Sequence, residues 1–177
     1  MLRDSIGSNS LFTIHNSYFI IRFVARRHNS LIPLSHQHQH ALALAVIIRR
    51  KFGLKETESI WRQEMVLKVQ KLYARELRGH FEVEEEVLFP GMQLYLGKLP
   101  LVDELVRDHV AIRGLVRGVE AMPSREALSE FGLVLEAHVR KEERKLFREF
   151  EKRMPADEAA RLGGEISAAL NRACAKL

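Results

Sequence analysis

The sequence predicts an all-α fold: an up-down antiparallel four-helix bundle with a short extra C-terminal helix and a loose N-terminal leader. Only 10 of the 177 residues are Gly and 5 are Pro, and long stretches contain neither. Within those stretches apolar side chains recur every three or four positions, the period of one helix face. Helices joined by short loops pack as an antiparallel bundle. We assign the leader to residues 1–32, the bundle to 33–153 and the last helix to 154–177.

The leader differs from the rest of the chain in composition. It is rich in Ser and Asn and contains several arginines that only Asp4 opposes. We interpret it as a loose tail. Its apolar run at 18–24 is interrupted by Arg22 and is too short to span a membrane. We therefore expect no membrane partner.

The first two helices are bounded by recognisable start and stop signals. Ser35 is a candidate N-cap for a helix over about 36–52, whose last turn is basic and is followed by Gly53. A second helix spans about 57–88. Pro90, followed directly by a glycine, is expected to stop it.

The third and fourth helices are bounded in the same way. The third spans about 101–121 and ends before Pro123. Ser124 can cap the fourth, which runs over about 125–153. Pro155 ends the fourth helix and opens the final one, which a Gly-Gly pair should weaken.

The composition excludes several classes of protein. Hydrophobic residues make up 46% and charged residues 29%, which is typical of a folded soluble protein. The net charge is +5, but Lys and Arg are interspersed with Glu, so we expect no nucleic-acid partner. Cys174 is the only cysteine, which excludes an internal disulfide and favours a reducing, cytoplasmic location. The sequence leaves the oligomeric state open.

Two copies of His-x-x-x-Glu carry the chemistry of the chain. His80 and Glu84 form one copy and His138 and Glu142 the other, and Leu-Phe follows each after three residues. An imidazole and a carboxylate four residues apart project from one helix face and can reach the same metal ion. Both pairs lie in line with the apolar stripe of their helix, and so does His109 on the third helix.

The first helix supplies further histidines in the sequence His-Gln-His-Gln-His, at His36, His38 and His40. One helix face accepts residues three and four apart, not two apart, so the three cannot all point inward. His38 and His40 both have apolar residues three and four positions later. His36 has polar ones and is the weakest candidate.

Burying these histidines and glutamates together would be unfavourable without a cation. A lone buried carboxylate costs several kcal/mol or takes up a proton. A metal ion reverses that balance, because neutral imidazoles supply lone pairs and carboxylates neutralise its charge. The pattern therefore predicts a metal site. Three nearby glutamates lie off the apolar stripe and are interpreted as a solvated face: Glu82, Glu85 and Glu86.

The combined pattern resembles the hemerythrin-like HHE cation-binding family over most of the chain. Leu-Phe-Pro after the second-helix motif and Asp108-His109 on the third helix support the resemblance. It implies a non-heme di-iron centre of two Fe ions, with manganese or zinc also compatible with the ligand set. By the register of the family His38 is the first-helix ligand. The implied metal ligands are His38, His80, Glu84, His109, His138 and Glu142, with the two glutamates bridging.

The chain departs from the oxygen-carrying members of the family at two places. Arg113 stands where those proteins have a second third-helix histidine, and Glu142 replaces an aspartate, with Glu143 as a competing choice. These departures shift the expectation from reversible oxygen carriage towards sensing, storage or protection. We expect dioxygen or a similar small ligand, such as nitric oxide or peroxide, to bind. The alternatives are a di-iron oxidase or peroxidase and a metal-free helical interaction module.

Overall fold

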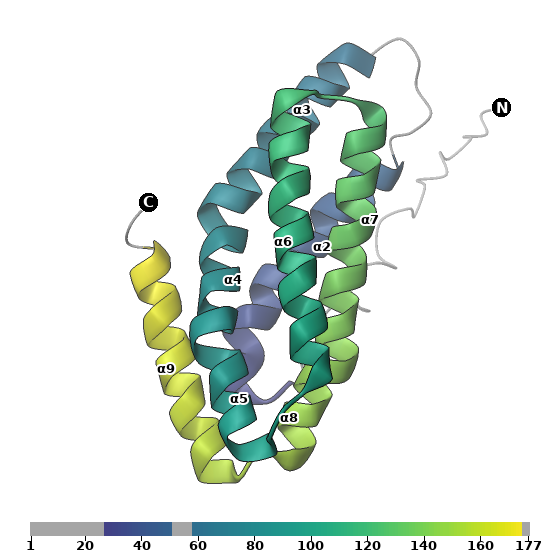
Figure 1. Cartoon of the computed structure of the whole chain (residues 1–177). Helices are drawn as coiled ribbons and strands as arrows, with labels where there is room; N and C mark the ends of the chain where they lie inside the picture. The colour runs from purple at the N-terminus through teal and green to yellow at the C-terminus, as the bar shows by residue number, and fades with distance from the viewer. Residues whose placement is uncertain (1–26, 51–57, 175–177) are drawn as a thin grey trace, which may run out of the picture.

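The computed structural model describes residues 27–50 and 58–174 (Figure 1). These residues form helices and connecting turns, and no β-strand occurs among them. The predicted all-α class is therefore confirmed. No helix within this part of the chain is both long enough and apolar enough to cross a membrane. The predictions for residues 1–26, for the end of the first helix and for Gly53 lie outside the described residues.

The first long helix, α2 (Ile32–Arg50), begins earlier than predicted and has a basic last turn as expected. Ser35 lies inside this helix and is not its N-cap. Its hydroxyl donates a hydrogen bond to Glu143 Oε1 at 2.8 Å. Ser35 therefore links α2 to a distant part of the chain, which a reading of local capping signals could not detect.

A short 3-10 helix, η1 (Asn29–Leu31), leads directly into α2. Its last residue is fully buried, and the Ser30 hydroxyl donates to the carbonyl oxygen of Ala159 at 2.7 Å. His28 Nδ1 accepts from the Ser30 amide and caps η1. The prediction of a loose leader up to residue 32 is therefore wrong for residues 27–32, which are packed into the fold.

Helical turns then continue without a break to Leu96, and two of these turns are π-helical. The segments are α3 (Glu58–Leu72), η3 (Tyr73–Leu77), α4 (Arg78–Val83), η4 (Glu84–Leu88) and α5 (Phe89–Leu96). The predicted stop at Pro90 is wrong. In a regular α-helix the proline ring clashes with the carbonyl four residues earlier, and the wider π-helical turn η4 just before it relieves that clash. The rod ends instead at Gly97, whose φ is +75°.

The next helices, up to Arg153, follow the predicted bounds closely. The third is α6 (Pro100–Ala121), and the fourth consists of three segments: α7 (Arg125–Lys141), η5 (Glu142–Leu146) and α8 (Phe147–Arg153). Ser124 caps α7 as predicted, because its hydroxyl accepts from the Ala127 amide at 3.0 Å. Like η3 and η4, η5 is a π-helical turn.

The final helix, α9 (Ala156–Cys174), is 19 residues long and not short as predicted. Gly163 does not weaken it but allows it to approach η1. A Cβ on Gly163 would lie 2.2 Å from Ser30 Oγ, whereas one on Gly164 would meet nothing within 4 Å. The glycine is therefore needed for close packing between two helices.

Four helical rods in the described part of the chain surround a shared centre. They are α2, the segments from α3 to α5, α6, and the segments from α7 to α8. Helix α2 packs against α7 and α3, and α6 packs against the same two helices (Figure 1). Helix α9 lies outside this group, against α4, η4 and η1. Each of the four rods therefore has a face turned towards a shared interior.

Two apolar clusters fill that interior, and a polar layer separates them. On α2 the buried residues of one cluster end at Leu34 and those of the other begin at Ala41, and His38 lies between them. The same change of cluster occurs at His109 on α6 and at Glu142 on η5. The predicted ligands therefore lie in one layer across the rods.

Candidate metal centre

The structure brings all six predicted ligands together in that layer. Their side chains come from all four rods and are 0–2% exposed. The six are His38 on α2, His80 on α4, Glu84 on η4, His109 on α6, His138 on α7 and Glu142 on η5. Their role as metal ligands stays a prediction, but their convergence is a property of the fold.

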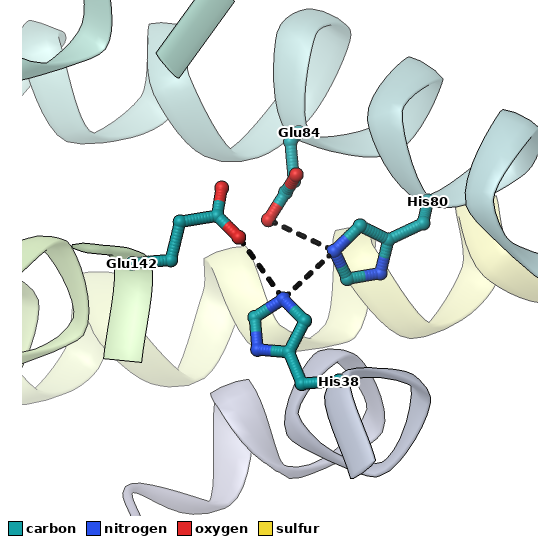
Figure 2. Close-up of side chains that lie close together, drawn as sticks. All are labelled: His38, His80, Glu84 and Glu142. Atoms are coloured by element: carbon teal, nitrogen blue, oxygen red, sulfur yellow. Dashed lines mark hydrogen bonds and ion pairs between the residues drawn. The ribbon is translucent and has the colours of Figure 1, made fainter. Parts of the chain in front are cut away.

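One quartet joins His38 and His80 to the two glutamates (Figure 2). His38 Nε2 lies 3.0 Å from His80 Nε2 and 3.0 Å from Glu142 Oε2. His80 Nε2 lies 3.2 Å from Glu84 Oε1. One donor atom from each of the four residues lies within 4.8 Å of every other, so the quartet is compact enough for a single metal ion.

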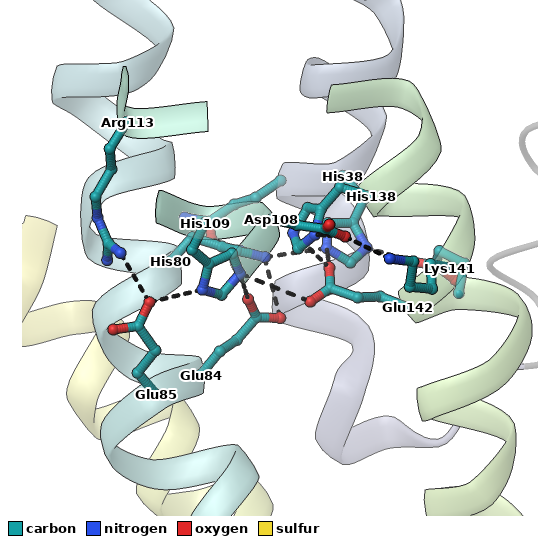
Figure 3. Close-up of polar contacts among 12 residues, drawn as sticks. His38, His80, Glu84, Glu85, Asp108, His109, Arg113, His138, Lys141 and Glu142 are labelled. Atoms are coloured by element: carbon teal, nitrogen blue, oxygen red, sulfur yellow. Dashed lines mark hydrogen bonds and ion pairs between the residues drawn. The ribbon is translucent and has the colours of Figure 1, made fainter. Parts of the chain in front are cut away.

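A second quartet joins His109 and His138 to the same two glutamates (Figure 3). His109 Nε2 lies 3.3 Å from Glu84 Oε2 and 4.0 Å from Glu142 Oε1. His138 Nε2 lies 3.3 Å from Glu142 Oε2. Both carboxylates therefore belong to both quartets, which is the arrangement that bridging ligands between two ions require.

The inner nitrogen of each histidine is Nε2, and its outer nitrogen, Nδ1, faces a polar side chain. His38 Nδ1 lies 2.7 Å from Glu143 Oε1, and His109 Nδ1 lies 2.7 Å from Glu85 Oε1. An ionised carboxylate only accepts hydrogen bonds, so each of these Nδ1 atoms carries the proton. The inner Nε2 is then the nitrogen that can present a lone pair to a metal ion.

The outer contacts of the other two histidines differ in length. His80 Nδ1 lies 2.8 Å from Gln37 Oε1, a hydrogen bond that fixes the ring orientation. His138 Nδ1 lies 3.5 Å from Asp108 Oδ2, which is an ion-pair contact without a hydrogen bond. Each outer partner belongs to a different helix segment from the histidine it contacts.

Cationic side chains hold the outer carboxylates in place. Arg113 Nη1 donates to Glu85 Oε1 at 2.9 Å, and Arg27 donates to the Glu143 carboxylate. Lys141 Nζ donates to Asp108 Oδ2 at 2.7 Å. The predicted solvated face is therefore wrong for Glu85, although it holds for the exposed Glu82 and Glu86.

The structure resolves two choices that the residue pattern left open. His40 is 65% exposed and its Nδ1 lies 2.7 Å from Glu76 Oε2, so His38 is the histidine of α2 that points inward. Glu143 contacts the outer nitrogen of His38, so Glu142 supplies the inner carboxylate of this segment.

The two motifs are longer than the His-x-x-x-Glu units recognised in the sequence. Both read His-x-x-x-Glu-Glu-x-x-Leu-Phe, at residues 80–89 and 138–147. In both copies the inner glutamate begins a π-helical turn, and the next glutamate contacts a histidine outside the motifs, His38 in one case and His109 in the other. This repeat, and the polar residue before each single histidine, were the sequence signals for the outer partners.

The electrostatics of the cluster show why it suits a cation. Burial and the charge of Glu142 raise the pKa of Glu84 to about 7. Burial and the neighbouring His38 lower the pKa of His80 to about 3. Burial opposes charge on His38, but contacts with Glu142 and Glu143 outweigh it and raise the pKa of His38 to about 10. Without a cation, these groups compete for protons in a dry site.

Unmet hydrogen-bonding capacity points to the same conclusion. Within the described chain, neither carboxylate oxygen of Glu84 or of Glu142 has a hydrogen-bond partner, and neither has the inner nitrogen of His109 or His138. Buried polar atoms are normally satisfied, because leaving one unpaired costs 1–3 kcal/mol or more. A metal ion coordinated by these inner atoms satisfies them all, so the donor set fits the group that the sequence pattern implied.

The fold and the site together define an all-helical protein with a buried His/Glu cluster suited to metal cations. A family model described as the hemerythrin HHE cation binding domain matches residues 33–150, most of the chain. The chain therefore belongs to the hemerythrin HHE family, and metal binding follows from that membership. Searches of curated proteins and of solved structures found no match.

Proposed function

We propose that this protein holds a non-heme di-iron centre and binds dioxygen or a related small oxidant, such as nitric oxide or peroxide, for sensing, storage or protection. The observation that carries the proposal is that two buried quartets share both of their carboxylates. Two separate sites would need separate acids. Shared acids indicate two ions held next to each other.

The ligand chemistry supports iron. Each position is offered two imidazole nitrogens and oxygens from Glu84 and Glu142. Mixed nitrogen and oxygen donors suit iron, and manganese or zinc are compatible with the same set. When bound, iron would supply redox chemistry towards a small oxidant. The protein contributes four oriented imidazoles, two shared charges and an apolar surround.

The surroundings of the centre favour a small ligand. Phe81 stacks on His109 with ring centroids 4.0 Å apart, and Phe147 stacks on His38 at 5.4 Å. Apolar clusters close the layer on both sides. These groups surround the centre with apolar and aromatic side chains, which favours a small ligand over a bulky polar substrate.

A metal-free interaction module is disfavoured by the unsatisfied buried atoms. A core without metal gains little from four histidines and two acids that leave carboxylate oxygens without partners.

The proposal also includes the up-down antiparallel bundle, a cytoplasmic location and the absence of a nucleic-acid partner. Ion pairs between basic and acidic side chains, such as Arg140 with Glu136, support the last point.

Metal analysis and absorption spectroscopy of protein purified from iron-replete cells test the proposal. We expect about two irons per chain, in keeping with the two quartets, and charge-transfer bands that change when dioxygen, nitric oxide or peroxide is added. The variant His40→Leu is the matched control and should keep its iron, whereas His38→Leu should lose iron. Iron-free wild-type protein, or equal iron in the two variants, would count against the proposal. Steady consumption of peroxide with an electron donor would instead indicate an enzyme.

A further inference from the structure

The cluster has an internal pseudo-two-fold arrangement that relates its two metal positions. The α2/α4 position is defined by His38 and His80, and the α6/α7 position by His109 and His138. Each position has one histidine from a motif repeat and one single histidine from outside the repeats, His38 or His109. Exchanging the two repeats exchanges the two quartets, so each group at one position has a counterpart at the other.

Most of these counterparts are alike. His38 and His109 each have an outer glutamate at 2.7 Å, Glu143 in one case and Glu85 in the other. Each glutamate is also paired with an arginine. This pair of contacts therefore does not distinguish the two metal positions.

The counterparts differ at the residue that precedes each single histidine. Gln37 lies before His38, and its amide oxygen is 2.8 Å from His80 Nδ1. Asp108 lies before His109, and its carboxylate oxygen is 3.5 Å from His138 Nδ1. One motif histidine therefore faces a neutral amide and the other a carboxylate.

A carboxylate and an amide act differently on a ligating imidazole. A carboxylate at ion-pair distance from Nδ1, such as Asp108 at 3.5 Å, favours positive charge on the ring and makes it a stronger donor through Nε2 than a neutral amide does. Outer partners of this kind change metal affinity by about 10–100-fold. Lys141 at 2.7 Å offsets the charge of Asp108 at long range, so the effect acts mainly through its contact with His138.

We infer that the two metal positions are unequal, that Asp108 makes the α6/α7 position the tighter one, and that the centre therefore fills in order through a one-ion form. This inference rests on the proposed paired centre. Asp108 and Gln37 are positioning residues here, because each acts on the metal through a ligating histidine.

A titration of the metal-free full chain with Mn²⁺ tests the inference. Calorimetry measures the affinity of each binding step, and electron paramagnetic resonance distinguishes isolated ions from pairs. An isolated Mn²⁺ gives the hyperfine pattern of a single nucleus, whereas a spin-coupled pair gives a broader spectrum with the more closely spaced pattern of two nuclei. At one equivalent the wild type should contain mainly isolated ions, and the two binding steps should differ by about ten-fold or more. A mixture of coupled pairs and metal-free chains at one equivalent would overturn the inference.

Substitutions locate the tight position. Asp108→Asn should weaken the first step by about ten-fold and narrow the gap between the steps, and Gln37→Glu should strengthen the second step. The matched control is Glu104→Gln, which removes the other acid near Lys141 at 3.6 Å and should change neither step. Unchanged steps in the folded Asp108→Asn variant, checked by circular dichroism, would overturn the inference.

Two further variants assign each step to its position. His80→Ala should remove the second step and keep the first, and His138→Ala should remove the first. The reverse pattern would overturn the order of filling. A chain that saturates with one Mn²⁺ whose affinity still depends on Asp108 would sink the paired centre and leave the tighter position at α6/α7. Two ions bound with equal affinity would keep the paired centre and overturn the inference that the α6/α7 position is the tighter one.

Discussion

Replacing Glu84 by Gln should stabilise the metal-free protein at high pH and remove most of the stability that the wild type gains from metal. The amide keeps the size of the side chain and removes its charge. In the metal-free protein, burial and the charge of Glu142 raise the pKa of Glu84 from 4.5 to about 7. An acid with a raised folded pKa stabilises the fold below its unfolded pKa, and that stabilisation is lost as the pH rises through the folded pKa.

The size of the metal-free effect follows from this pKa. A rise from 4.5 to about 7 corresponds to about 3 kcal/mol between the low-pH and high-pH limits. At about pH 8 the ionised Glu84 carboxylate destabilises the metal-free fold by roughly that amount, and Glu84→Gln should recover most of it. At about pH 5 the wild-type carboxyl is largely protonated, so the two proteins should differ little.

The stability gained on metal loading should largely disappear in this variant, because Glu84 belongs to both quartets. A free metal concentration about 100-fold above the dissociation constant stabilises the fold by about 2.7 kcal/mol. In a domain of this size each kcal/mol raises Tm by about 2–4 °C. Loading at about pH 8 should therefore raise the wild-type Tm by roughly 5–11 °C, and it should raise that of Glu84→Gln by little.

Thermal unfolding followed by circular dichroism, with chelator and with metal, measures both effects. The matched control is Glu82→Gln, an exposed position on the same rod. It should follow the wild type within about 0.5 kcal/mol in both states. A full metal-dependent rise in Tm for Glu84→Gln, or equal behaviour of the two variants, would refute the assignment of Glu84 as a shared ligand.

Three further predictions concern the groups around the centre. Glu85→Gln should weaken metal binding about ten-fold in calorimetry by releasing His109, and the exposed Glu86→Gln should not. Gly163→Ala should destabilise the fold by about 1–3 kcal/mol in thermal unfolding, because its Cβ meets η1, whereas Gly164→Ala should be neutral or stabilising. Loading at about pH 6 should release more protons than at about pH 8, since the free Glu84 carboxyl has a pKa of about 7; calorimetry in buffers of different ionisation enthalpy measures the difference.

The inner residues of the centre could be predicted from the sequence because their signal is local. His80 and Glu84 are one helical turn apart, and each motif falls on an apolar stripe that had to face the interior. The choice between His38 and His40 was less local. Both have apolar neighbours, and only the packing of α2 against α7 and α3 decides which one points inward.

The outer partners could not be predicted in the same way. Glu85 and Asp108 act on histidines that other helices carry, so their role depends on how the rods are placed side by side. The predicted position of Glu85 off the apolar stripe is correct, since Glu85 remains partly exposed, as does Asp108. A partly exposed acid can nevertheless contact the outer nitrogen of a buried imidazole, and helical periodicity alone does not show this.

The wrong expectations at Pro90 and Ser35 have a related cause. The rule that proline stops a helix assumes regular α-helical spacing before it, and the π-helical turn at Glu84–Leu88 removes that condition. The rule that serine caps a helix assumes a free N-terminus. Here η1 leads straight into α2, and the Ser35 hydroxyl bonds to Glu143 instead.

The π-helical turns also explain why Leu-Phe follows both motifs. In an α-helix the amide that donates to the Glu142 carbonyl would be that of the residue four positions later, Leu146. In the π-helical turn the Phe147 amide donates to the Glu142 carbonyl, so the phenylalanine takes that place. Its ring then stacks on His38 at 5.4 Å, and Phe89 stacks on His109 at 5.9 Å by the same construction. One inserted residue per motif thus covers each single histidine with an aromatic ring and shields its imidazole from water.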